Sequence, residues 1–261
     1  MPIDRPMITS LLFFPDKEII ERPGDYGLTA EDVFPMSADG VKLHGWYFQA
    51  RENKGALLFL HGNAGNISGR VHKVTGWVKR GISVLLIDYR GYGQSGGAIQ
   101  QGDDIVRDAQ AGLDWLINRG SRGPVPVILY GESLGSHPAV RLAVKHKTAG
   151  LVLEAPFTAF TDLAAIHYPA LPKFMTESLL KDFRFDNLGQ IAKIQAPLFV
   201  IHGTDDATCP YAMGQRLFGE APQPKEFFSV PHAGHNNLPE CAGEDFWKKP
   251  CGFLKKENRL S

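Results

Sequence analysis

Residues 125–144 read VPVILYGESLGSHPAVRLAV, and this stretch decides the fold. An apolar run is followed at once by Gly131-Glu132-Ser133-Leu134-Gly135 and then by apolar residues at helical spacing. The pattern G-x-S-x-G between a buried strand and a helix is a nucleophile elbow, a sharp turn that exposes the serine hydroxyl. The turn crowds the backbone, so glycine is needed two positions before and after the serine. We predict that Ser133 is a nucleophile.

Short apolar runs recur on both sides of this stretch, between longer amphipathic segments. They lie at residues 56–60, 82–87, 125–130, 151–153, 197–201 and 226–230. Continuous apolar runs of this length are typical of parallel strands that are covered on both faces. Residues 31–49 differ. Apolar residues in this segment flank the turn signal Ser37-Ala38-Asp39-Gly40, and this pattern predicts a hairpin.

Residues 103–119 have the pattern of a covering helix. One helical face carries Ile105, Ala109, Leu113, Leu116 and Ile117. Alternating strands and helices predict an α/β fold with a doubly wound, mostly parallel sheet, covered by helices on both faces. The active site of such a sheet lies at the carboxyl ends of its strands.

The last two apolar runs lead into a candidate acid and a candidate base. A serine hydroxyl is a poor nucleophile at neutral pH, so it needs a general base, and the base needs an acid that orients it. One run leads into His202-Gly203-Thr204-Asp205-Asp206, and the next leads into Pro231-His232-Ala233-Gly234-His235. We predict Asp206 as the acid and His235 as the base. The chain order serine, acid, histidine is the order that accompanies this elbow.

Alternatives exist for both partners of the serine. Asp205 could replace Asp206, and Glu154, which directly follows another predicted strand, could also supply the carboxylate. His232 lies nearer the strand end than His235, but we expect it to be structural or partly exposed. No H-E-x-x-H or similar ligand spacing is present, so no metal site is predicted.

Two backbone N–H groups are expected to stabilise the oxyanion of the tetrahedral intermediate. Leu134, which follows the nucleophile, offers one. The second should come from the loop His61-Gly62-Asn63-Ala64-Gly65-Asn66, which follows the strand at 56–60. We choose Asn63 as this donor, with Ala64 as the alternative.

One further glycine pattern resembles a nucleotide fingerprint. Gly91-Tyr92-Gly93-Gln94-Ser95-Gly96 matches G-x-G-x-x-G after a strand. A dinucleotide site also needs an acidic residue about 20 positions on, at the end of the next strand. Asp114 lies within an amphipathic helix instead, so NAD binding is rejected and no cofactor is predicted.

Composition favours one globular domain over residues 1–261. The 261 residues are 43% hydrophobic, and the 28 basic residues balance the 28 acidic ones. Without a cationic block, nucleic acid is not an expected partner. The three cysteines are widely spaced and cannot all pair, which predicts free thiols in a reducing compartment.

Two segments stand apart from the strand and helix pattern. The apolar run at residues 7–14 is about half the length of a membrane span and lacks the features of a signal peptide, so we predict no integral membrane segment and a cytoplasmic protein. Residues 157–190 are rich in aromatic residues and proline. They predict a small cap insertion or, equally, a packed surface excursion without substrate contact.

Several further motifs carry a resemblance to a known family. They are Leu12-Phe13-Phe14-Pro15, Ala38-Asp39-Gly40-Val41-Lys42-Leu43-His44-Gly45-Trp46, His61-Gly62-Asn63-Ala64-Gly65-Asn66, Asp88-Tyr89-Arg90-Gly91-Tyr92-Gly93 and Ala155-Pro156-Phe157-Thr158. With the elbow, they resemble the depalmitoylase-related α/β-hydrolase-domain proteins and their bacterial relatives. The resemblance implies an eight-stranded sheet, hydrolysis of an ester or thioester, and a triad at Ser133, Asp206 and His235.

The sequence therefore predicts a serine hydrolase that cleaves small to medium acyl esters or thioesters through a covalent acyl-enzyme. A protein depalmitoylase or a serine peptidase is the alternative among enzymes, because the same triad cleaves thioesters and amides. A ligand-binding protein on the same scaffold is the alternative outside enzymes, since fold does not fix function.

Overall fold

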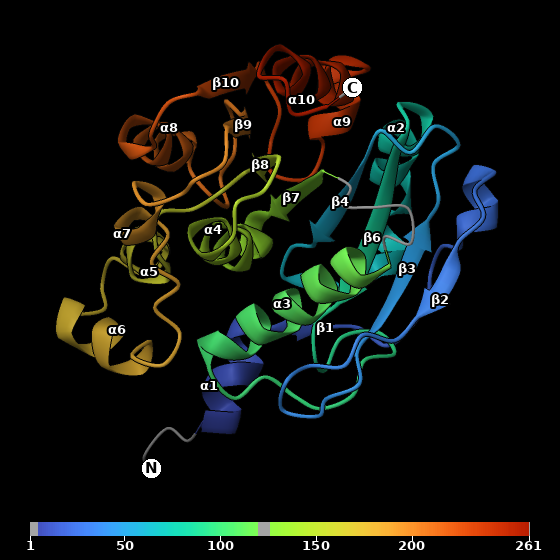
Figure 1. The fold of residues 1–261 in the computed structure, drawn as a ribbon. Coiled ribbons are helices and arrows are strands. Elements are labelled where there is room, and N and C mark those ends of the chain that lie inside the picture. Colours follow the sequence, from blue (N-terminus) through green and yellow to red (C-terminus); the bar gives the residue numbers. More distant parts are fainter. Residues whose placement is uncertain (1–4, 120–125, 261) are drawn as a thin grey trace.

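The computed structural model describes residues 5–119 and 126–260 (Figure 1). Within these residues, eight strands form one sheet in the order β10-β9-β8-β7-β4-β6-β3-β2. Neighbouring strands are parallel from β10 to β6, and β3 and β2 complete the sheet in antiparallel pairings. The predicted mostly parallel, eight-stranded sheet is confirmed.

The strands have bounds close to the apolar runs of the sequence. They are β1 (Phe14–Pro15), β2 (Glu31–Val33), β3 (His44–Phe48), β4 (Gly55–Leu60), β5 (Ala64–Gly65), β6 (Ile82–Asp88), β7 (Val127–Glu132), β8 (Gly150–Glu154), β9 (Leu198–Gly203) and β10 (Lys225–Val230). Strands β1 and β5 form a separate parallel pair. The first residue of the strand predicted at 125–130 lies outside the described residues.

The helices alternate with the strands from β4 onward. The α-helices are α1 (Arg5–Leu12), α2 (Val71–Lys79), α3 (Gly102–Asn118), α4 (Ser136–Lys145), α5 (Phe160–His167), α6 (Lys173–Leu179), α7 (Leu188–Ile191), α8 (Tyr211–Glu220), α9 (Leu238–Ala242) and α10 (Asp245–Lys256). The 3-10 helices are η1 (Pro23–Tyr26), η2 (Ile67–Arg70) and η3 (Ser133–Gly135).

Helices cover both faces of the sheet, which is why its central strands are apolar throughout. Every residue of β4 and β6 is buried. Helices α3, α4 and α8 pack on one face, and α2 and α10 pack on the other (Figure 1). Each face has its own apolar cluster, and together the two layers form the core that holds the strand ends in place.

The hairpin and the covering helix were predicted, with one error in detail. Strands β2 and β3 pair antiparallel across the 31–49 segment, and α3 begins and ends within one residue of its expected bounds. Ile117 was expected on the buried face of this helix but is 55% exposed. The preceding residue, Leu116, is buried in the core, so Ile117 lies just outside the buried face of the helix.

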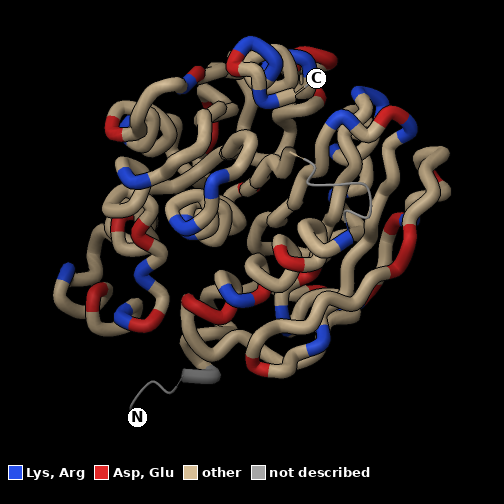
Figure 2. Tube along the Cα trace, viewed as in Figure 1, with Lys and Arg blue, Asp and Glu red and all other residues tan. Residues whose placement is uncertain are grey.

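The charge distribution, the helix composition and the cysteines can be compared with the predictions from the sequence. In Figure 2, Lys and Arg are interspersed with Asp and Glu along the chain and do not gather in one region. Among the described helices, none combines the length and the apolar composition that a bilayer crossing requires. Cys209, Cys241 and Cys251 are free thiols, as predicted.

Candidate active site

Ser133 lies at the turn between β7 and α4 in a backbone conformation that few residues adopt. Its φ is +50°, in the left-handed region, which is rare outside glycine and is retained at functional sites. The flanking glycines explain how the turn closes. A Cβ on Gly131 would lie 2.5 Å from the Gly135 carbonyl oxygen, and a Cβ on Gly135 would collide with the Leu60 carbonyl oxygen. Only glycine fits at both positions.

The structure brings Ser133, His235 and Asp206 together in one hydrogen-bonded series. His235 Nε2 lies 3.0 Å from Ser133 Oγ, and His235 Nδ1 lies 2.7 Å from Asp206 Oδ2. An ionised carboxylate only accepts hydrogen bonds, so Nδ1 carries the proton and Nε2 is free to accept the serine proton. The three residues follow β7, β9 and β10, whose carboxyl ends lie at the same edge of the sheet.

The backbone holds the Asp206 carboxylate in a fixed orientation. Asp206 Oδ1 accepts hydrogen bonds from the backbone N–H groups of Thr208 at 2.9 Å and Cys209 at 2.8 Å. Oδ2 faces His235 Nδ1 at 2.7 Å and His202 Nε2 at 3.4 Å. Burial opposes ionisation of this group, but the rings of His202 and His235 outweigh it and hold the pKa of the carboxyl well below its ordinary value. Asp206 is therefore ionised at neutral pH.

The other candidates for acid and base lie elsewhere. His232 is 92% exposed at its side chain and faces Asp205, with Nδ1 3.7 Å from Oδ2. Glu154 is fully buried and contacts Lys73 and Tyr130 instead of His235. No group of three or more metal-ligating side chains is present in the described part of the chain.

Asn63 and Leu134 both line the hollow beside Ser133. Leu134 is the second residue of η3, and the first N–H groups of a helix have no acceptor within it. Asn63 is fixed through its side chain, because Nδ2 donates to the Leu12 carbonyl at 2.7 Å and the Tyr92 hydroxyl donates to Asn63 Oδ1 at 3.0 Å. Both backbone N–H groups are thus on rigid segments next to the serine.

The hollow above Ser133 has a volume of about 450 Å³ and a mainly apolar wall. This volume falls in the lower half of the range for small-molecule sites. Besides Asn63, Ser133 and Leu134, three segments supply the wall: α1, the 157–190 segment and the loop after β9. Ile8, Leu12, Phe157, Phe160, Leu163 and Leu180 are among its apolar residues. No Asp, Glu, Lys or Arg is among the described residues that line it.

A buried ionic cluster, which the sequence analysis did not predict, lies directly behind the elbow. Arg70 Nη2 lies 3.4 Å from Glu132 Oε1, and Lys73 Nζ lies 3.5 Å from Glu132 Oε2 and 2.7 Å from Glu154 Oε1. Arg70 Nη1 also donates to the Ala64 carbonyl at 2.7 Å. Arg70 therefore links the loop that carries Asn63 to the residue that precedes Ser133.

The charges in this cluster compensate one another. Burial opposes ionisation of Glu132, but Lys73 and Arg70 outweigh it and keep its pKa below the ordinary value. Burial raises the pKa of Glu154, against the pull of the Lys73 ammonium. The one sequence signal for this cluster was Lys73 itself, a charged residue between Val71 and Val74 on the apolar face of α2.

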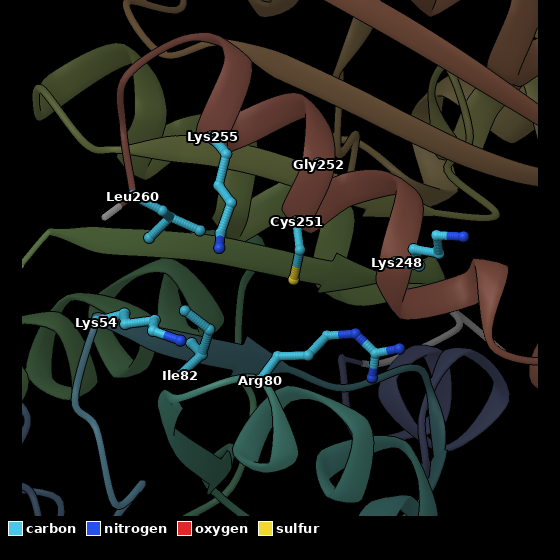
Figure 3. Close-up of a pocket in the computed structure, with 8 residues that line it drawn as sticks. All are labelled: Lys54, Arg80, Ile82, Lys248, Cys251, Gly252, Lys255 and Leu260. Carbon is cyan, nitrogen blue, oxygen red and sulfur yellow. The ribbon is translucent and has the colours of Figure 1, made fainter.

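A second hollow, of about 300 Å³, lies at the opposite ends of the strands (Figure 3). It is lined by Lys54, Arg80, Ile82, Lys248, Cys251, Gly252, Lys255 and Leu260. Lys54 pairs with Glu52, and Arg80 pairs with Glu244. Burial raises the pKa of Cys251 to about 11, so its thiol is a poor nucleophile at neutral pH. The lining offers no pairing of a nucleophile with a base.

Comparison with known protein families matches residues 51–190 to the model described as serine aminopeptidase, S33. The match includes Ser133 and the 61–66 loop but ends before Asp206 and His235. An uncharacterized protein of Mycobacterium tuberculosis is 37% identical over 229 residues, covering 87% of this chain and 80% of that protein. The α/β-hydrolase domain-containing protein WAV2 of Arabidopsis thaliana is 32% identical over 253 residues, covering 90% of this chain and 81% of that protein.

Solved structures share the fold at lower identity. The esterase Pf2001 of Pyrococcus furiosus superposes with a TM-score of 0.79 at 23% identity, over 94% of this chain and 98% of that one. An α/β-hydrolase of Vibrio vulnificus gives a TM-score of 0.75 at 20% identity, over 97% and 94% of the two chains. With the sheet order, the elbow and these relatives established, the chain belongs to the α/β-hydrolase family.

Proposed function

We propose that the protein is a serine hydrolase that cleaves carboxylic esters or thioesters of small to medium acyl groups through a covalent acyl-enzyme. One observation carries the proposal. The hydrogen-bonded series Asp206, His235 and Ser133 opens onto an apolar hollow of about 450 Å³, which Asn63 and Leu134 also line.

In the proposed mechanism, Ser133 Oγ attacks the ester carbonyl while its proton passes to His235 Nε2. Asp206 holds the imidazole in the required tautomer and stabilises the imidazolium. The backbone N–H groups of Asn63 and Leu134 stabilise the negative oxygen of the tetrahedral intermediate. The intermediate collapses to the acyl-enzyme as His235 gives its proton to the leaving alcohol. Water, activated by the same histidine, then releases the acid and restores Ser133.

The wall of the hollow favours an ester over an N-terminal peptide. An aminopeptidase must recognise a free α-ammonium group, for which a carboxylate is the natural partner. The described lining residues include no Asp or Glu, and burying an unpaired ammonium there would be strongly unfavourable. An apolar acyl chain, in contrast, gains free energy on entering such a hollow.

We also propose that residues 157–190 act as a cap on a single domain that spans residues 1–261. Helices α5 and α6 and the residues around them supply more than half of the side chains that line the hollow. Aromatic contacts stiffen the segment, since the ring centroids of Phe157 and Phe160 lie 5.0 Å apart and those of Phe160 and Phe185 lie 4.5 Å apart.

Turnover of three substrates tests the proposal: p-nitrophenyl butyrate, a butyryl thioester and alanine p-nitroanilide. We expect both butyryl substrates to be cleaved, and Ser133→Ala to lower kcat by about 10³-fold or more while the protein still folds. Faster cleavage of the anilide would make the protein an aminopeptidase. Absence of turnover with retained butyrate-ester binding would make it a binding protein.

A further inference from the structure

Two facing parts of the wall beside Ser133 come from segments that are far apart in the sequence. Helix α1 supplies Ile8, Leu11 and Leu12 on one side, and residues 157–190 supply the facing side. Figure 1 shows α1, in dark blue, and the golden α5 and α6 toward the same end of the molecule. The N-terminal apolar run, which is too short to span a membrane, therefore forms part of the wall beside Ser133.

Helix α1 is anchored to the catalytic loop and to the cap at its C-terminal end. The Leu12 carbonyl accepts the hydrogen bond from Asn63 Nδ2, and β1 pairs with β5 directly after Asn63. Phe13 is buried, and its ring centroid lies 5.6 Å from that of Phe183. These contacts fix the C-terminal end of α1 beside the hollow. Ile8 lies one turn farther from Asn63 than Leu12 does.

The position of His235 decides which part of an ester occupies this hollow. His235 Nε2 must protonate the leaving alcohol, so the alcohol leaves on the His235 side of Ser133. Ser133, Leu134 and Asn63 line the hollow, whereas His235 is not among the lining residues. The hollow therefore adjoins Ser133 and the two oxyanion donors, and His235 forms no part of its wall.

We infer that the hollow between α1 and the cap is the acyl-chain site, that Ile8 and Leu171 set the chain length it accepts, and that the alcohol projects past His235. This inference rests on the proposed serine hydrolase function. Leu171 is 41% exposed and Leu11 is 67% exposed, so they mark the open end of the hollow. Ile8 is half-buried, and a larger side chain at this position would fill the hollow.

The test is Ile8→Trp assayed on two ester series. In the first series the acyl group grows from acetate to octanoate on a constant p-nitrophenol. In the second the alcohol grows from methanol to octanol on a constant acetate. Each methylene excluded from the hollow lowers kcat/KM by about fourfold. We expect Ile8→Trp to lower kcat/KM for the octanoate by about tenfold or more, and to change the acetate and the whole alcohol series by less than about twofold.

Ser10→Trp is the matched control, since Ser10 is exposed on the same helix and does not line the hollow. It should leave both series unchanged. Leu171→Trp, on the facing wall, should reproduce the selective loss and serves if Ile8→Trp does not fold. A loss confined to the alcohol series, or no change in either series for both variants, would overturn the acyl assignment. Failure of the underlying function has another signature, because Ser133→Ala would then turn over both series as fast as the wild type.

Discussion

Asp206, and not its neighbour Asp205, meets His235: Oδ2 lies 2.7 Å from Nδ1, while Asp205 faces the exposed His232. We therefore expect Asp206→Asn to lower kcat by about 10³ to 10⁴-fold, because an amide cannot hold the imidazole in the active tautomer. Asp205→Asn is the matched control and should stay within about threefold of the wild type. Steady-state kinetics on p-nitrophenyl butyrate measure both. A larger fall for Asp205→Asn would mean that the acid has been assigned to the wrong residue.

Arg70 is expected to act as a positioning residue for the oxyanion site. It joins the Ala64 carbonyl to the Glu132 carboxylate, so its loss frees the segments that carry Asn63 and Leu134 to move apart. We expect Arg70→Met to lower kcat by about 10 to 100-fold with little change in KM, since displacements of about 1 Å have effects of this size.

Two further readouts separate this role from a general loss of structure. Added guanidinium ion should restore part of the kcat of Arg70→Met by filling the vacated site. Arg119→Met is the control, because it removes a surface ion pair to Glu31 outside the site. An equal loss in both variants, or a rise in KM with unchanged kcat, would contradict the positioning role.

Acyl chain length should govern the rate up to a limit. Each methylene buried in the hollow of about 450 Å³ strengthens binding of the acyl chain by up to about 0.8 kcal/mol. Once the hollow is full, the rest of the chain must extend into water or displace the cap. We expect kcat/KM for p-nitrophenyl esters to rise from acetate through the medium chains and to be lower for palmitate. The assay is run below the concentration at which micelles form. A continuous rise through palmitate would favour the depalmitoylase alternative.

Stability should depend on pH through His137, a buried residue of α4. Burial lowers the pKa of His137 to about 4, and the nearby Arg141 adds to this, against the hydrogen bond between Nδ1 and Asn187 Oδ1 and the charge of Asp103. In the unfolded chain the histidine pKa is about 6.5, so between about pH 4 and 6.5 the unfolded chain binds more protons than the folded one. The contribution of neutral His137 is therefore complete above about pH 6.5 and is lost as the pH falls toward 4.

The free energy of unfolding should fall by up to about 1.4 kcal/mol for each pH unit within that window. Urea titrations at pH 7 and pH 5 measure it, and His137→Gln should reduce the difference between the two. His232→Gln, which removes an exposed histidine, is the control. An unchanged pH dependence in His137→Gln would show that this residue does not carry the effect.

Local patterns were enough to predict the sheet, the elbow and the loops that carry the acid and the base. The elbow is recognisable because its strand, glycines and helix are contiguous, and Asp206 and His235 each follow a strand directly. The ionic cluster was missed because Arg70 and Glu132 are 62 positions apart, and Lys73 and Glu154 are 81 apart. No local spacing encodes such pairs.

The N-terminal wall of the hollow escaped prediction for the same reason. Ile8 and Leu12 precede Ser133 by more than 120 positions, and α1 is tied to the site by β1, the Asn63 side chain and the contact of Phe13 with Phe183. Periodicity identifies an apolar segment but not the element against which it packs. Ile117 shows the converse limit, because an apolar residue at the margin of a helical face can be exposed while its neighbour Leu116 is buried.

The most direct test of the central claim is covalent labelling with a fluorophosphonate, followed by peptide mapping by mass spectrometry. The probe reacts with a serine only where a base activates the hydroxyl and an oxyanion site receives the phosphonyl oxygen. We predict one adduct, on Ser133, that forms in the wild type, forms far more slowly in His235→Ala and is absent from Ser133→Ala. Labelling of another serine, or an intact wild-type protein that remains unlabelled, would contradict the assignment of Ser133 as the nucleophile.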